Sequence, residues 1–205
     1  MEGGAKIDNR LLILILQHPR EKKENMATAA LAVAMLRRAE LVVGLSWPNL
    51  ARALGGAAGP AADPRRWAVL HLASARPRGF GLEQEVVALD RHGQPAADQQ
   101  AMLRGLDGAV LLDGSWSEAK ALWWRNPWLL KLRRLVLDPQ RPSDFNRVRR
   151  EPRREALSTI EAAALLLARV EKRPEIETAL KSALDRLIAE TLPATRTQAH
   201  GRVER

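Results

Sequence analysis

The sequence predicts an α/β domain with a mainly parallel sheet and flanking helices, and three observations support this fold class. Short apolar runs of strand length alternate along the chain with segments whose apolar residues recur at helical spacing. The first run, residues 11–17, is aliphatic over six residues, which is typical of a central strand buried on both faces. The alternation continues to residue 190 without an internal repeat. Alternating strands and helices favour a parallel sheet.

The remaining elements follow in order along the chain. The first half predicts a helix over residues 25–38 and a strand over 40–45. A surface excursion over 46–66, with a short helix at 49–54, is followed by strands over 67–73 and 85–90. The second half predicts a helix over residues 98–106, capped by Asp98, a strand over 109–113, a helix over 115–125 and a strand over 134–137. A basic loop over 139–152, a buried helix over 158–170 and an amphipathic helix over 174–190 follow.

Length and composition limit the class of protein. We expect one domain over residues 1–192 and a flexible tail over 193–205. The longest apolar stretch, residues 29–36, has eight residues, whereas a membrane-spanning helix needs roughly 20, so we expect a soluble, cytoplasmic protein. The chain has no cysteine, and its four histidines lack metal-ligand spacing, so we expect no metal site.

Charge points to a polyanionic partner. The chain has 33 Lys plus Arg against 24 Asp plus Glu, a net charge of +9. Residues 131–154 hold nine basic and three acidic residues, so nine minus three places +6 of that excess in one segment. Clustered arginine of this kind is typical of contact with RNA or DNA, and the alternative is a solvated, arginine-rich surface.

Polar residues follow three predicted strands. These groups are Gln17-His18-Pro19, Ala73-Ser74 and Asp113-Gly114-Ser115-Trp116. Ligands of parallel sheets sit beyond the carboxyl ends of the strands, so we expect the three groups to lie on one edge.

Each motif also has an ordinary structural explanation. Ser115 with Glu118, and Ser158 with Glu161, have the spacing of capping boxes, although a helix start also offers N–H groups to an anion. A carboxylate closing an apolar strand, as Asp113 does, usually has a partner or a task. A lone histidine at a strand end, as at His18, is usually structural.

The tryptophans leave two interpretations open. Trp116 would either pack in the core or cover a flat ring. Trp123, Trp124 and Trp128 lie within six residues, beside Arg125 and Lys131, and could stack on unpaired bases. The pair Trp124 and Trp128 has helical spacing, so for this pair we expect packing in the core instead.

Together these motifs resemble the DTW-domain family along nearly the whole chain. Gln17-His18-Pro19 with Glu21 is similar to its Q-H-P-x-E element, and Asp113-Gly114-Ser115-Trp116 to its D-x-[ST]-W element. Pro142-Ser143-Asp144-Phe145 resembles P-S-x-Y, and the six residues from Leu157 to Ala162 match L-S-T-x-E-A. Four motifs in this order are more specific than any one of them.

The resemblance implies a SPOUT-like fold with a C-terminal trefoil knot that holds S-adenosylmethionine as co-substrate. It also implies an enzyme that transfers the 3-amino-3-carboxypropyl group to N3 of a uridine in tRNA and releases 5′-methylthioadenosine. We expect tRNA as partner, no membrane association and a monomer.

The resemblance and the strand-end positions together predict site residues. Asp113 is the candidate catalytic base or orienting carboxylate. The cofactor-binding candidates are Ser74, Leu112, Gly114, Ser115, Trp116, Leu157, Ser158 and Thr159. The RNA-binding candidates are His18, Arg20, Lys22, Lys23, Arg125, Arg147, Arg149 and Arg150.

The chain departs from the family pattern at three points. Ser115 replaces the more usual Thr, and Phe145 stands where Tyr is common. Many bacterial members carry an N-terminal cysteine cluster, and this chain has no cysteine. The alternatives are therefore a SPOUT-type RNA methyltransferase and a non-catalytic RNA-binding relative.

Overall fold

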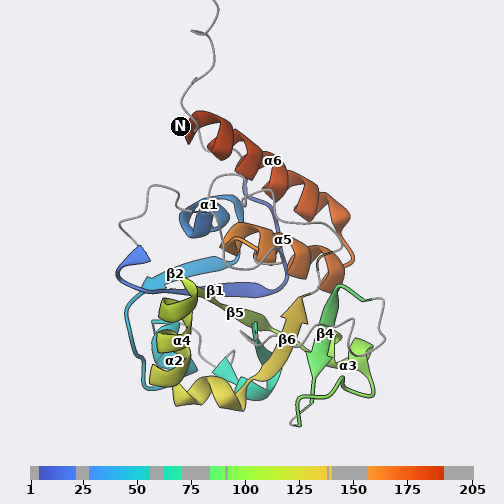
Figure 1. Cartoon of the computed structure of the whole chain (residues 1–205). Helices are drawn as coiled ribbons and strands as arrows, with labels where there is room; N and C mark the ends of the chain where they lie inside the picture. The colour runs from blue at the N-terminus through green and yellow to red at the C-terminus, as the bar shows by residue number, and fades with distance from the viewer. Residues whose placement is uncertain are drawn as a thin grey trace, which may run out of the picture.

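The fold is described from a computed structural model, which describes residues 5–21, 28–55, 62–70, 84–90, 92–137, 139 and 157–191. Its centre is a six-stranded sheet in the order β2-β1-β5-β3-β6-β4 (Figure 1). The strands are β1 (Leu12–Gln17), β2 (Ala39–Val43), β3 (Trp67–Leu70), β4 (Val86–Leu89), β5 (Gly108–Asp113) and β6 (Arg133–Leu137). All neighbours pair in parallel except β4 with β6, so the predicted mainly parallel sheet is confirmed.

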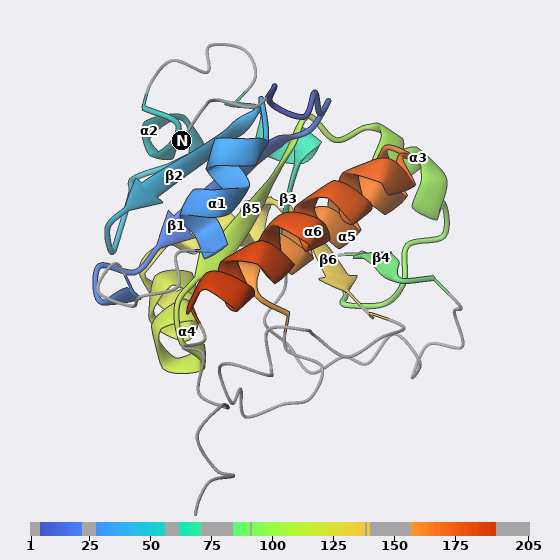
Figure 2. The same cartoon turned by 90° about the horizontal axis from the view of Figure 1, so that it is seen from above.

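Helices cover both faces of the sheet (Figures 1 and 2). On one face lie α1 (Thr28–Met35), α5 (Thr159–Val170) and α6 (Pro174–Thr191). On the other lie α2 (Leu50–Ala53), α4 (Trp116–Arg125) and the short 3-10 helix η5 (Pro127–Lys131). Helix α3 (Gln99–Arg104) packs beside β4, and a second 3-10 helix, η3 (Pro64–Arg66), precedes β3.

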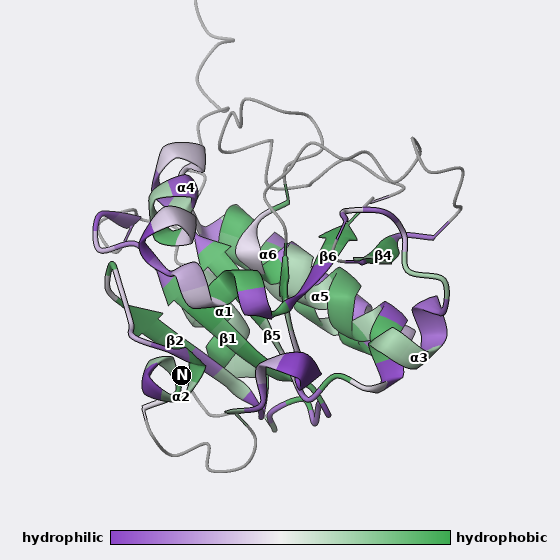
Figure 3. Ribbon diagram, turned by 90° about the horizontal axis from the view of Figure 1, so that it is seen from below, coloured by the Kyte–Doolittle hydropathy of each residue, from purple (hydrophilic) through white to green (hydrophobic). Residues whose placement is uncertain are grey.

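The central strand divides its side chains between two cores, because successive side chains of a strand point to opposite faces. Ile13 and Ile15 join the core under α1, α5 and α6, whereas Leu14 and Leu16 join the core with α2 and η5. All four are fully buried, and burial of each such side chain is worth about 1.5–3 kcal/mol. Figure 3 shows the apolar character of the central strands.

The boundaries predicted from the sequence differ from the observed ones by a few residues. Asp98 caps α3 as expected, since its carboxylate accepts from the N–H of Ala101 at 2.8 Å. The antiparallel direction of β4 and the two 3-10 helices were not predicted. Residues 71–73 of the third expected strand, the basic loop and the tail from 193 lie outside the described residues.

Two further observations concern the fold as a whole. No helix in the described part of the chain is long and apolar enough to span a membrane. The trefoil knot depends on the path of residues 140–156, which the structure does not describe, so it stays a prediction.

The order of the strands contains a switch point. Strand β1 lies beside β5, but the chain continues from β1 to α1 on one face and from β5 to α4 on the other. Open α/β sheets generally bind their ligands at such a switch point, beyond the carboxyl ends of the two strands. In this chain the residues at that point are Gln17 and Asp113.

Candidate functional site

The site is built around the carboxylate of Asp113, the last residue of β5. Gln17 and Asp113 are partners in the register of β1 and β5, and Gln17 Nε2 donates to Asp113 Oδ2 at 2.8 Å. The other carboxylate oxygen, Oδ1, accepts from the hydroxyl of Thr159 at the start of α5. Only 6% of Asp113 is exposed. The two hydrogen bonds, both from uncharged donors, offset part of the free-energy cost of burying this carboxylate.

The first and second motifs are also joined through the backbone. The N–H of His18 donates to the carbonyl oxygen of Asp113 at 3.0 Å, which extends the β1–β5 pairing by one residue. The chain then turns at Gly114, whose φ is +150°. A Cβ at Gly114 would meet Glu118 Cβ at 2.9 Å and His18 Cβ at 3.4 Å. The turn therefore requires glycine both for its backbone conformation and for the space.

Helix α4 begins with the predicted capping box. The backbone N–H and the hydroxyl of Ser115 both donate to Glu118 Oε2, at 2.9 and 2.8 Å. Burial alone raises the pKa of Glu118, but these bonds and the charges of His18 and Arg20 outweigh it and hold that pKa below its ordinary value. Glu118 is thus a carboxylate anchored at the edge of the site.

His18 lies against this carboxylate. Its Nδ1 is 3.4 Å from Glu118 Oε1 and 3.3 Å from the backbone nitrogen of Arg20. The ring either accepts the Arg20 N–H or, when protonated, donates to Glu118. The side chain is buried against the start of α4, and the predicted contact of His18 with RNA stays a prediction.

Helix α5 begins in the same way as α4. The backbone N–H and hydroxyl of Ser158 both donate to Glu161 Oε2, at 2.8 and 2.6 Å, and both residues are buried. The capping box is confirmed, and it orients the next residue, Thr159, toward Asp113. The start of α5 therefore faces the carboxyl ends of β1 and β5.

The structure brings together three of the four motifs found in the sequence. Gln17-His18, Asp113-Gly114-Ser115 and Ser158-Thr159 meet at one edge, although 96 residues separate Gln17 from Asp113. Leu112 and Leu157 flank this edge and are half-buried. Ser74, Lys22, Lys23, Arg147, Arg149, Arg150 and the fourth motif lie outside the described residues.

Sequence reasoning missed two members of the site. Gln17 was placed on the rim but was given no role, and Glu118 was treated only as a capping residue. The signal for Gln17 was available, because a polar residue closing an aliphatic strand beside a second such strand needs a partner. The contact of Glu118 with His18 depends on the β1–β5 register, which no local pattern contains.

The tryptophans divide into two groups. Trp128 is 7% exposed and donates from Nε1 to Asn126 Oδ1 at 3.2 Å, which confirms core packing for this residue. For Trp124 the prediction of core packing is wrong, because 77% of it is exposed. The helix ends at Arg125, so Trp128 lies in η5 and the two residues do not share a helical face. Trp116 is 38% exposed.

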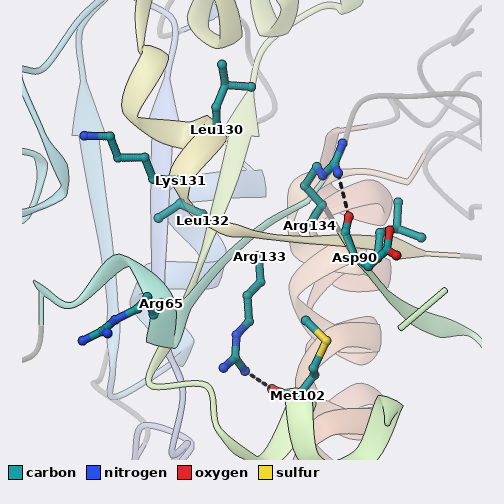
Figure 4. A pocket seen from close by; sticks show the side chains of 9 residues that line it. Arg65, Asp90, Met102, Leu130, Lys131, Leu132, Arg133 and Arg134 are labelled. Atoms are coloured by element: carbon teal, nitrogen blue, oxygen red, sulfur yellow. Dashed lines mark hydrogen bonds between the residues drawn. The ribbon is translucent and has the colours of Figure 1, made fainter. Parts of the chain in front are cut away.

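A groove of about 610 Å³ lies at the opposite edge of the sheet (Figure 4). It is lined by Arg65, Leu89, Asp90, Met102 and residues 130–134. Arg133 donates to the carbonyl of Met102 and Arg134 to that of Asp90, both at 2.6 Å. None of the predicted site residues lines this groove, so it is separate from the site around Asp113.

The arrangement at the β1–β5 switch has a definite chemical capacity. It combines a buried carboxylate, two hydroxyl-bearing helix starts and a turn that leaves no room for a side chain. A carboxylate can attract a cation or accept a proton, and the N–H groups of a helix start can bind an anion. Within the described residues no group of three or more His, Cys, Asp or Glu side chains could hold a metal ion.

Comparison with known proteins gives a consistent result. The DTW domain family matches residues 4–192. A curated relative, tRNA-uridine aminocarboxypropyltransferase 2 of Drosophila melanogaster, is 33% identical over 172 residues, which are 82% of this chain and 59% of the relative. The chain thus spans less than two thirds of that relative's length, and no solved structure matches it significantly. Because the family match covers nearly the whole chain and three family motifs meet at one edge of the sheet, this chain belongs to the DTW-domain family.

Proposed function

We propose that this protein transfers the 3-amino-3-carboxypropyl group of S-adenosylmethionine to N3 of a uridine in tRNA and releases 5′-methylthioadenosine. The observation that carries the proposal is the buried carboxylate of Asp113, held by Gln17 and Thr159 at the switch point of the sheet. The membership of the family and the name of the relative support the same reaction.

The residues at the rim fit S-adenosylmethionine chemically. The co-substrate carries a positive sulfonium, an ammonium and a carboxylate. The start of α5 at Thr159 supplies N–H donors for the carboxylate, and the carboxylate of Asp113 lies beside that helix start. Leu112, Gly114, Ser115 and Trp116 would wall the pocket on the β5 side, and Leu157 and Ser158 on the α5 side.

The group that is transferred depends on how the pocket orients S-adenosylmethionine relative to the uridine. When bound, the sulfonium activates all three carbons attached to it, so the carbon that the pocket presents to the RNA decides the product. Uridine N3 must lose its proton as its bond to the transferred carbon forms and the carbon–sulfur bond breaks. Asp113 would accept or orient that proton, since each of its oxygens already accepts one bond and has capacity for another.

The RNA would reach the site across basic residues. Arg20, two residues after His18, and Arg125, the last residue of α4, are both exposed. Lys22, Lys23, Arg147, Arg149 and Arg150 are proposed from the sequence as further phosphate contacts. Residues 1–192 would form one SPOUT-like domain with a trefoil knot, and the protein would act as a cytoplasmic monomer.

The experiment is a product analysis. Purified protein is incubated with S-adenosylmethionine and unmodified tRNA transcripts, and the digested nucleosides are identified by mass spectrometry. The proposal expects 3-(3-amino-3-carboxypropyl)uridine together with methylthioadenosine. A methylated nucleoside with S-adenosylhomocysteine would contradict it and indicate a methyltransferase instead.

A further inference from the structure

Helix α4 carries a row of aromatic and basic side chains on its exposed side. Trp116, Lys120 and Trp124 are spaced four residues apart, which places them along one ridge of the helix. All three are exposed, whereas Ala119 and Leu122 on the other side are buried in the core. We call these three residues the α4 ridge.

The tryptophans of the α4 ridge are exposed, although such large apolar side chains usually pack in the core. Trp124 keeps 77% of its surface exposed, and a large aromatic side chain left in water at this level contributes little to folding. The ammonium of Lys120 lies 5.8 Å from the centre of the Trp116 ring, which is within the range of a cation–π contact. An exposed aromatic–cation–aromatic row is typical of a surface that binds something else.

The position of the ridge connects it with the site. Helix α4 starts two residues after Gly114, so Trp116 follows Asp113 by three residues and Trp124 lies about two helical turns farther along the helix. With a rise of about 1.5 Å per residue, the eight residue steps from Trp116 to Trp124 span about 12 Å along the helix axis. That length matches about three to four stacked nucleotides at about 3.4 Å each.

The far end of the ridge is held rigidly. Asn126, which follows α4 and is fully buried, donates to the carbonyl of Leu45 at 3.1 Å and accepts from the N–H of Trp47 at 2.8 Å. Ser46 donates to the carbonyl of Arg125 at 3.0 Å. The loop after β2 is thereby fixed to the end of α4, and the exposed Leu45 extends the apolar surface there.

From these observations we infer that the α4 ridge is a stacking platform for unpaired nucleotides next to the modified uridine. This inference rests on the proposed function, since it takes RNA as the ligand. Each base has a flat face that stacks on an indole ring irrespective of sequence, and Lys120 would meet the backbone phosphate between two stacked bases. Charge favours RNA over an apolar protein partner, because Lys120 and Arg125 are exposed and the helix's acidic residue, Glu118, is bonded to Ser115.

The test uses Trp124, which lies outside the proposed catalytic and cofactor-binding residues. Binding of an unmodified tRNA transcript is measured over a series of salt concentrations for the wild type, Trp124→Ala and Trp124→Phe. We expect Trp124→Ala to weaken binding roughly five- to hundredfold without changing the salt slope, because stacking releases no counterions. Trp124→Phe should recover most of the affinity, since a flat ring remains.

Two control variants make the test specific. Leu130→Ala removes a similarly exposed apolar side chain, 67% exposed, at the opposite edge of the sheet, and it should leave the affinity unchanged. Lys120→Gln should lower the salt slope by about one, as expected for one phosphate contact. Thermal unfolding of Trp124→Ala should match the wild type, because the residue is exposed.

The outcomes also separate this inference from the proposed reaction. Wild-type affinity in Trp124→Ala, or a change in its oligomeric state without a change in RNA affinity, would overturn the stacking platform even if the wild type makes the expected product. Trp124-dependent RNA binding by a wild type that makes no aminocarboxypropyl uridine would support the platform and refute the reaction. Where both hold, Trp124→Ala should raise KM for tRNA and leave kcat nearly unchanged.

Discussion

The carboxylate of Asp113 is buried and accepts a hydrogen bond on each oxygen, and one substitution tests its proposed role in proton transfer. Asparagine keeps the shape of the group and one acceptor oxygen, and the Gln17 amide or the Thr159 hydroxyl can turn to accept from its NH2, so Asp113→Asn disturbs the structure less than Asp113→Ala. Asp113→Asn should lower kcat by about 10²–10⁴-fold, the range of general acid–base catalysis, while the affinity for S-adenosylmethionine changes little. Turnover and cofactor titrations on the same preparation give the two numbers. Near-normal turnover would remove Asp113 from the mechanism.

Gly114 allows a prediction about stability at the level of one residue. A side chain there would have to adopt a φ of +150° and would also meet Glu118 Cβ at 2.9 Å. Gly114→Ala should therefore lower the free energy of unfolding by about 1–3 kcal/mol or more, as measured by urea denaturation. Gly55→Ala is the matched control, since Gly55 has a φ of +68° but no atom within 4 Å of an added Cβ. Equal losses in the two variants would show that the close contact at Gly114 is irrelevant.

The start of α4 makes the stability of the protein depend on pH. Because the pKa of folded Glu118 lies below the ordinary value of 4.5, its contribution to stability is present above that value and is lost as pH falls through the folded pKa. Glutamine can still fill the capping position, so Glu118→Gln should lose less stability in acid than the wild type does. Urea unfolding at several pH values between about 6 and about 3 tests this. Parallel curves for the two proteins would contradict the assignment.

The junction between α4, η5 and the loop after β2 depends on one side chain. Asn126 makes four hydrogen bonds, to Leu45, Trp47, Leu122 and Trp128, and is fully buried. Asn126→Ala would leave buried groups without partners at about 1–3 kcal/mol for each, so we expect a loss of about 3 kcal/mol or more in the free energy of unfolding. Chemical denaturation measures it. A loss below about 1 kcal/mol would mean that other groups hold this junction.

At the scale of the whole molecule, the strands were the most predictable part. Aliphatic runs such as residues 11–17 identify buried strands locally, and capping boxes identify the starts of α4 and α5. The contacts that form the site were less predictable, because Gln17 meets Asp113 only through the pairing of β1 with β5. The error at Trp124 has a local cause, since Pro127 ends the helix and breaks its spacing with Trp128.

The central claim concerns which carbon of S-adenosylmethionine reaches the uridine. The most direct measurement incubates the protein and unmodified tRNA with co-substrate carrying an isotope label either in the carboxyl group or in the methyl group, and counts label in the recovered RNA. We predict label in the RNA from the carboxyl-labelled form and none from the methyl-labelled form. Label from the methyl group alone would contradict the proposed transfer.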